Sequence, residues 1–150
     1  MLTTYKSFSV KLQTHPPERP GVAWAVFVLA LAWFAHLALN RFVDGYEGYY
    51  ALIAQLVAGG SLPYLDFFYP QMPVLPYFYA LLPWAVGSTD WVLLRLVTAA
   101  CAALSALLLY LLIQRRVGQG PGVMAALLFC VHPFVMSEFS LVKSYAATTM

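Results

Sequence analysis

Three carboxylates lie close together in this chain, in the stretch from Asp44 to Pro73. Asp44, Glu47 and Asp66 are half of its six acidic residues, and long apolar runs flank the stretch on both sides. A carboxylate held near lipid is costly and usually has a function. Such a group can take a proton from a hydroxyl as a general base, or bind a divalent cation through its oxygen atoms. We therefore take Asp44 and Glu47 as candidate catalytic residues and Asp66 as a supporting residue.

The residues after the first two carboxylates are typical of a helix over residues 48–58, which Gly59-Gly60 ends. Asp44 and Glu47 then precede this helix or lie in its first turn, where the positive end of the helix dipole favours ionised carboxylates. The helix is almost wholly apolar, so it should lie along the membrane interface with both carboxylates near the lipid headgroups. The alternative is that they only cap the helix, as a capping box at i and i+3.

Aromatic residues crowd the stretch from Pro63 to Pro73, which also contains Asp66 and Gln71. Tyr and Trp rings at this density are typical of the aromatic belt at headgroup level. The alternative is that the rings stack on a sugar. Asp66 is either a turn residue or a ligand for a divalent cation.

The composition of the whole chain indicates a membrane protein. Of 150 residues, 62% are hydrophobic and 9% are charged, whereas a soluble domain carries about 25% charged residues. So few charges cannot cover a globular surface, and we predict an all-α, polytopic helical membrane protein. The net charge of +2 and the lack of a basic cluster argue against nucleic acid as a partner. Cys101 and Cys130 lie in apolar runs, where they pack as small apolar residues.

Three apolar runs are predicted transmembrane helices, and a fourth run is interrupted by prolines. The predicted spans cover residues 21–39, 91–113 and 122–134, and Pro133 ends or bends the third. The run at residues 73–86 contains three prolines, which favours an interfacial or re-entrant helix over a full crossing.

The basic residues set the predicted orientation. Three of them precede the first span, and Arg115 with Arg116 follows the second, so the positive-inside rule places both groups in the cytoplasm. Residues 1–20 then form a cytoplasmic tail and residues 40–90 a large outer loop, with the protein in the plasma (bacterial inner) membrane. Residues 144–150 are similar to the first turns of a fourth helix. We therefore expect residues 21–150 to be the amino-terminal part of a larger transmembrane domain.

With these features in place, five short segments resemble, in their order and spacing, the amino-terminal part of GT-C type membrane glycosyltransferases. The similar families are the dolichyl-phosphate-mannose protein mannosyltransferases and the bacterial aminoarabinose-transferase-like proteins. The matching segments are Glu47-Gly48-Tyr49-Tyr50, Gly60-Ser61-Leu62-Pro63-Tyr64-Leu65-Asp66-Phe67-Phe68, Gln71-Met72-Pro73, Val86-Gly87-Ser88 and Arg95-Leu96. Tyr46 stands where the families have an Asp beside the Glu, and Met72 stands where they have a Pro. Asp44 and Glu47 are therefore both candidates for the base.

The resemblance implies an enzyme that transfers a sugar from a polyprenyl-phosphate donor to a lipid, protein or glycan acceptor at the outer membrane face. Asp44 or Glu47 would act as the base on the acceptor hydroxyl. Arg95 or Lys143 would face the donor phosphate, and a divalent cation could assist. The full set of substrate-binding residues implied is Tyr49, Tyr50, Tyr64, Asp66, Gln71, Arg95 and Lys143.

Several alternatives stay open from the sequence. Arg95 lies one turn into the second span, where it could instead extend its side chain to the interface as a structural residue. A non-catalytic membrane subunit could bind lipid-linked sugars through the same aromatic loop without needing a base. The chain could also be an inactive truncated product, and we expect these 150 residues alone to be inactive.

Overall fold

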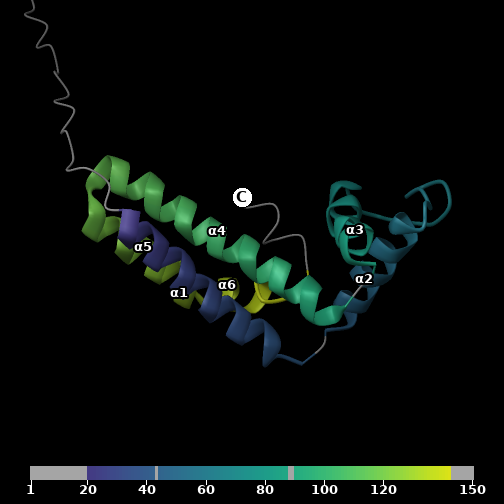
Figure 1. The fold of residues 1–150 in the computed structure, drawn as a ribbon, viewed down its shortest axis with the longest axis horizontal. Helices are drawn as coiled ribbons and strands as arrows, with labels where there is room; N and C mark the ends of the chain where they lie inside the picture. Colours follow the sequence, from purple (N-terminus) through teal and green to yellow (C-terminus); the bar gives the residue numbers. More distant parts are fainter. Residues whose placement is uncertain (1–19, 43, 88–89, 143–150) are drawn as a thin grey trace, which may run out of the picture.

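The computed structural model describes residues 20–42, 44–87 and 90–142, and these residues form helices with connecting turns (Figure 1). The helices are α1 (Pro20–Leu39), α2 (Gly45–Ala58), α3 (Val74–Val86), α4 (Trp91–Val117), α5 (Gln119–Val131) and α6 (Pro133–Glu138). The described residues contain no β-strand, only an isolated bridge between Pro63 and Phe67. The predicted all-α class is therefore confirmed.

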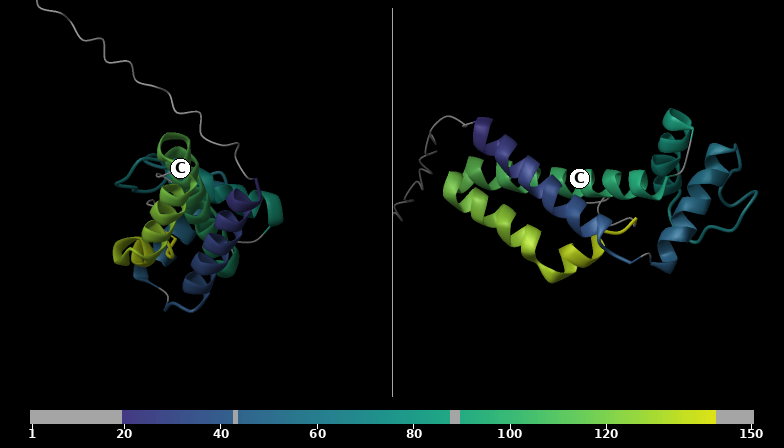
Figure 2. Two further views of the ribbon diagram at one scale, coloured as in Figure 1. Left: turned by 90° about the vertical axis from the view of Figure 1, so that its left-hand side faces the viewer. Right: turned by 60° about the horizontal axis from the view of Figure 1, so that its bottom comes forward.

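Helix α4 is the central element of an elongated bundle and packs against both α1 and α5. Figures 1 and 2 show the α2–α3 pair set apart at the end of this bundle where α1 ends and α4 begins. The bundle core combines Phe34 of α1 with the alanines Ala99, Ala102 and Ala106 of α4. Small side chains at these positions allow the helix backbones to approach closely.

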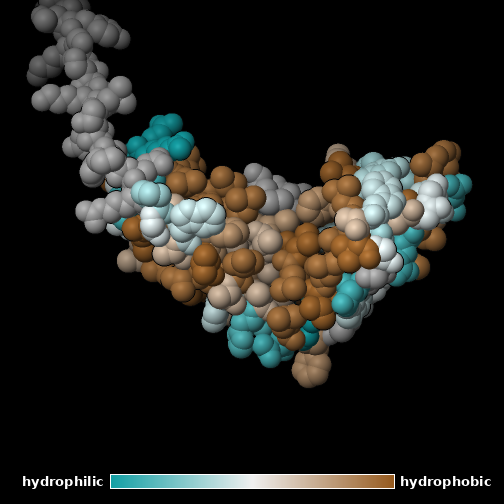
Figure 3. All heavy atoms as spheres, viewed as in Figure 1, coloured by the Kyte–Doolittle hydropathy of each residue, from teal (hydrophilic) through white to brown (hydrophobic). Residues whose placement is uncertain are grey.

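Two of the helices are long and apolar enough to cross a membrane. These are α1, with a mean hydropathy of 2.2 over its most apolar window, and α4, with 2.4. Hydrophobic side chains cover most of the bundle on the face shown in Figure 3, and hydrophilic ones gather toward its ends. A hydrophobic bundle surface of this kind suits contact with lipid.

The observed helices differ from the predicted spans at two places. Helix α4 continues past residue 113 to Val117, because Gln and Arg end the apolar run but are good helix formers. Helix α5 has 13 residues and ends at Val131, and Pro133 then opens α6. At a rise of about 1.5 Å per residue, α5 alone is shorter than a hydrocarbon core of about 30 Å. The predicted break at Pro133 is confirmed, but α5 by itself is not a full crossing.

Both helices predicted in the loop at residues 40–90 are present. Helix α2 begins at Gly45, three residues earlier than predicted, because Asp44 is its N-cap. Helix α3 covers Val74–Val86 and ends at Gly87, whose φ of 75° lies in the left-handed region that glycine adopts without strain. The two helices pack on each other through α2 residues such as Ala54 and α3 residues such as Tyr79.

Helices α4 and α5 approach each other closely at Gly122. A Cβ atom there would lie 3.0 Å from the carbonyl oxygen of Tyr110, and 3.1 and 3.2 Å from the Cβ and N atoms of Gln114. Gly122→Ala should therefore lower the free energy of unfolding by about 1–3 kcal/mol, as overpacked sites do. The matched control is Gly120→Ala in the same helix, where a Cβ meets nothing within 4 Å. Unfolding in mixed detergent micelles, followed by tryptophan fluorescence, measures both; equal stability of the two variants would contradict the close approach.

Candidate functional site

A buried ion pair joins Glu47 on α2 to Arg95 on α4. Nη2 of Arg95 lies 2.6 Å from Oε2 of Glu47, and Nε of Arg95 donates to Oε1 at 3.2 Å. Glu47 is 0% exposed and Arg95 is 6% exposed. A two-point contact between a guanidinium and a carboxylate is among the strongest polar contacts in proteins.

The remaining N–H groups of Arg95 bond to the last turn of α1 and to the residues that follow it. Nη1 donates to the carbonyl oxygens of Ala38 at 2.8 Å and Arg41 at 3.0 Å, and Nη2 donates to that of Phe42 at 3.3 Å. Carbonyl groups at the end of a helix have no hydrogen-bond donor within the helix. Arg95 provides N–H donors for them here. These bonds, with the two to Glu47, occupy all five N–H donors that a guanidinium has.

Glu47 is equally well bonded. Its Oε2 accepts from the backbone N–H of Asp44 at 3.2 Å, and its Oε1 accepts from the backbone N–H of Val142 at 3.1 Å. The pair therefore connects the end of α1, the start of α2, the first turns of α4 and the segment after α6. Burial of two charges is tolerated here because each is paired and fully hydrogen-bonded.

This geometry corrects two expectations from the sequence. Glu47 was expected near the lipid headgroups as a candidate base. Instead its side chain is buried, because Arg95, 48 residues further along, pairs with it there. Arg95 was expected at the surface or against a phosphate, but its guanidinium is buried and used inside the protein. We therefore treat both residues as structural.

Asp44 lies next to this pair in the chain but in a different environment. It is the N-cap of α2, and with Glu47 it forms a capping box. It also lines an open cavity of about 570 Å³ between the start of α2 and the loop before α3. The residues around this cavity are Asp44, Gly45, Tyr46, Tyr49, Tyr50, Phe68, Pro70 and Gln71. Of the two candidate bases, Asp44 is thus the one at a cavity.

Gln71 is held in the wall of this cavity by tyrosines. The hydroxyl of Tyr50 donates to Oε1 of Gln71 at 3.1 Å, and the hydroxyl of Tyr64 donates to the backbone carbonyl of Gln71. Tyr69 is buried and stacks on Tyr49, a lining residue, with ring centroids 6.2 Å apart and an angle of 19° between the ring planes. Burial raises the pKa of Tyr69 to about 12, so its hydroxyl stays protonated at neutral pH. The cavity therefore combines one carboxylate, one amide and flat aromatic faces.

The other predicted site residues lie elsewhere. Oδ2 of Asp66 accepts from the backbone N–H of Leu62 at 2.7 Å, which closes a turn; this agrees with the turn-residue interpretation of Asp66. Lys143 lies outside the described residues, as does Ser88 of the Val86-Gly87-Ser88 segment. Within the described ranges, no three His, Cys, Asp or Glu side chains come together as a metal-binding group. Among the residues that the structure describes, Asp44 is the one carboxylate that lines the cavity.

Sequence reasoning missed Tyr46, Phe68 and Tyr69 as members of this site. Tyr46 and Phe68 line the cavity, and Tyr69 supports it from below. The signal was present for Tyr69, since it follows Asp66 by three residues in the same aromatic stretch. For Tyr46 the signal was its place between Asp44 and Glu47, at the position where the resemblance expects an Asp.

Comparison with known proteins gives no assignment for this fold and site. No model of a protein family matches the chain, and no curated protein and no solved structure matches it either.

Proposed function

We propose that this chain is the amino-terminal part of a membrane glycosyltransferase that moves a sugar from a polyprenyl-phosphate donor to an acceptor at the outer membrane face. The observation that carries the proposal is the cavity with Asp44, Gln71 and the tyrosines at the end of an apolar helical bundle. A carboxylate beside stacked aromatic rings and an amide suits a sugar, because sugars offer hydroxyl groups for hydrogen bonding and flat apolar faces for rings.

In the proposed reaction Asp44 is the general base. Its carboxylate takes the proton of the acceptor hydroxyl while that oxygen bonds to the sugar carbon and the lipid phosphate leaves. Tyr49 and Tyr46 offer rings to the sugar, and Gln71 offers its amide from a position fixed by Tyr50. Glu47 holds the start of α2, and so holds Asp44 in place, through the capping box and its pair with Arg95.

The helix arrangement supports a placement of this cavity at a membrane surface. Helices α1 and α4 run in opposite directions, so the end of α1 and the start of α4 meet at the α2–α3 pair (Figure 2). Arg115 and Arg116 lie at the far end of α4. With these arginines in the cytoplasm, the cavity faces outward in a multi-pass inner-membrane protein whose amino terminus is cytoplasmic.

The proposal is tested by transfer of label. Membranes containing the protein as the cell makes it are incubated with a panel of labelled polyprenyl-phosphate hexoses and pentoses, and labelled lipid, protein and glycan products are separated. We expect one donor to give a product that membranes lacking the protein do not form. If a donor binds but no label moves, the chain is instead a non-catalytic subunit that holds lipid-linked sugars, since the aromatic cavity can bind a sugar without using a base.

A further inference from the structure

A second cavity lies where α1 ends. It measures about 580 Å³ and is bordered by the end of α1, by α6 and by the turn that follows. Its lining includes His36, Asn40, Arg41 and Ser137. The proposed transferase reaction uses none of these side chains.

Arg41 is anchored through only one end of its guanidinium. Nη1 donates to the carbonyl oxygen of Ser137 at 2.6 Å and to the hydroxyl of Ser140 at 3.2 Å, with a longer contact to the carbonyl of Met136 at 3.5 Å. Among the described residues, no hydrogen bond engages Nε or Nη2. These nitrogens carry three N–H groups, so Arg41 is a fixed cation that keeps donors for a ligand.

The imidazole of His36 also offers an N–H group as a hydrogen-bond donor. Nδ2 of Asn40 donates to the carbonyl oxygen of His36 at 2.8 Å, which fixes the orientation of the amide. The same Nδ2 lies 3.2 Å from Nδ1 of His36, so Nδ1 acts as the acceptor. The neutral imidazole must then carry its proton on Nε2. The hydroxyl of Ser137 already donates to Oε1 of Glu138 at 3.1 Å, so it offers no donor to a ligand.

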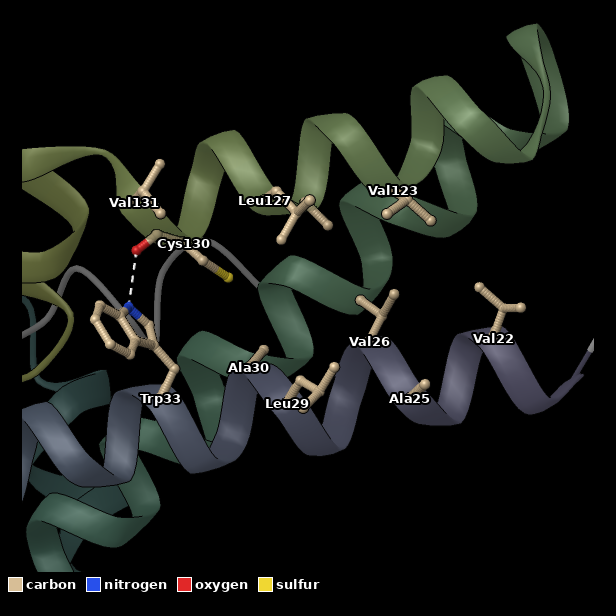
Figure 4. A pocket seen from close by; sticks show the side chains of 11 residues that line it. Val22, Ala25, Val26, Leu29, Ala30, Trp33, Val123, Leu127, Cys130 and Val131 are labelled. Carbon is tan, nitrogen blue, oxygen red and sulfur yellow. Dashed lines mark hydrogen bonds between the residues drawn. The ribbon is translucent and has the colours of Figure 1, made fainter.

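An apolar groove lies between α1 and α5, on the other side of Trp33 from this cavity. It measures about 340 Å³, and Figure 4 shows Val22, Val26 and Leu29 of α1 facing Val123 and Leu127 of α5 across it. The groove exists because α1 and α5 each pack closely on α4 but touch each other little.

Trp33 marks the boundary between the apolar and polar parts. Its indole N–H donates to the carbonyl oxygen of Cys130 at 3.0 Å across the groove (Figure 4). Its ring stacks on His36 with centroids 6.5 Å apart. One turn further along α1 the lining becomes polar, at His36 and Asn40. Tryptophan is typical of such boundaries at the membrane interface.

We propose that the two parts form one binding site for an anionic membrane phospholipid. The phosphate lies against Arg41 and the imidazole of His36, and one acyl chain lies along the groove between α1 and α5. Charge complementarity argues for this occupant. The cavity at the end of α1 offers the guanidinium of Arg41, with N–H groups that no described residue accepts, and the N–H of His36. The lining of the groove between α1 and α5 is almost wholly apolar. The inference requires only that α1 and α5 contact lipid and does not depend on the transferase activity.

Native mass spectrometry of the protein released from detergent tests this site. Phosphatidylglycerol, diacylglycerol with the same acyl chains, and inorganic phosphate are each titrated against wild type, Arg41→Gln and Arg116→Gln. We expect phosphatidylglycerol to bind wild type and Arg116→Gln at least tenfold more tightly than it binds Arg41→Gln. A charge-assisted contact of about 1.5–3 kcal/mol corresponds to a change in affinity of tenfold or more. Arg116 lies at the opposite end of the bundle and controls for loss of charge.

A second variant keeps the test valid if loss of Arg41 disturbs α6. Ala25→Leu narrows the apolar groove and leaves Arg41 unchanged, so it should lower the affinity for phosphatidylglycerol at least threefold. The control is Ala32→Leu, which lies on α1 but outside the groove lining and should leave this affinity unchanged. Equal binding of phosphatidylglycerol and diacylglycerol, or of phosphatidylglycerol and inorganic phosphate, would overturn the proposal. Displacement of phosphatidylglycerol by a polyprenyl phosphate that binds more than tenfold more tightly would also overturn it, since the occupant would then be a transferase substrate.

Discussion

Arg95→Gln should lower the free energy of unfolding by about 3–5 kcal/mol, the usual cost of breaking a buried ion pair by removing one partner. The substitution leaves the carboxylate of Glu47 buried with its main partner gone, and it deprives the carbonyls of Ala38 and Arg41 of their donor. A domain is commonly stable by only about 5–15 kcal/mol. We therefore expect a large fraction of Arg95→Gln to be misfolded or degraded.

The matched control is Arg116→Gln, which removes the same charge from an exposed position in the last turn of the same helix. A surface substitution of this kind should change stability by no more than about 0.5 kcal/mol. Unfolding in mixed detergent micelles, monitored by tryptophan fluorescence, compares the two. Equal midpoints for Arg95→Gln and Arg116→Gln would show that the buried pair does not hold these helices together.

A double-mutant cycle then isolates the pair itself. Glu47→Gln combined with Arg95→Gln removes both charges, so neither is left buried without a partner. The double variant should be less destabilised than the sum of the single variants, by about 0.5–3 kcal/mol of coupling. Additive losses would mean that the two side chains stabilise the fold through separate contacts, such as those of Arg95 to the end of α1 and of Glu47 to Val142.

Asp44→Asn should reduce sugar transfer by about 10²–10⁴-fold, the usual contribution of a general base. Asparagine caps a helix as well as aspartate does, so the start of α2 and the shape of the cavity should be preserved. The variant replaces the proton-accepting carboxylate with a neutral amide of nearly the same shape. Transfer of label from the polyprenyl-phosphate donor, normalised to the amount of folded protein, measures the loss.

Asp90→Asn is the control for this prediction. Asp90 is the N-cap of α4, and its Oδ1 accepts from the backbone N–H of Val92 at 3.0 Å. The same acid-to-amide change at a second N-cap, away from the cavity, should leave transfer within about twofold of wild type, because Asn retains the cap. If Asp44→Asn transfers sugar as fast as Asp90→Asn, Asp44 is not the base and the cavity acts by binding alone.

Much of the helical framework could be predicted from the sequence, because the signals for it are local. The apolar run at residues 21–39 became α1, and the pair Gly59-Gly60 marked the end of α2. The sequence places Asp44 and Glu47 at the N-terminus of α2, and the capping box that it offers as the alternative to a catalytic role is present. Each of these features depends on residues within a few positions of one another, and these are the interactions that a pattern along the chain records.

The sequence by itself determined an all-helical, apolar chain with carboxylates at the start of α2 and a dense aromatic loop after it. Only the tertiary structure decided which carboxylate is buried. Glu47 and Asp44 are three residues apart and similar in sequence context, yet Arg95, 48 positions beyond Glu47, holds one inside the bundle while the other lines a cavity. Arg95 and Arg41 differ for the same reason: the N–H groups of Arg95 all have partners inside the fold, whereas Arg41 keeps N–H donors at a cavity in the part of the chain that the structure describes. A charged side chain is stable where its partners lie, and those partners are brought together by helix packing rather than by spacing along the chain.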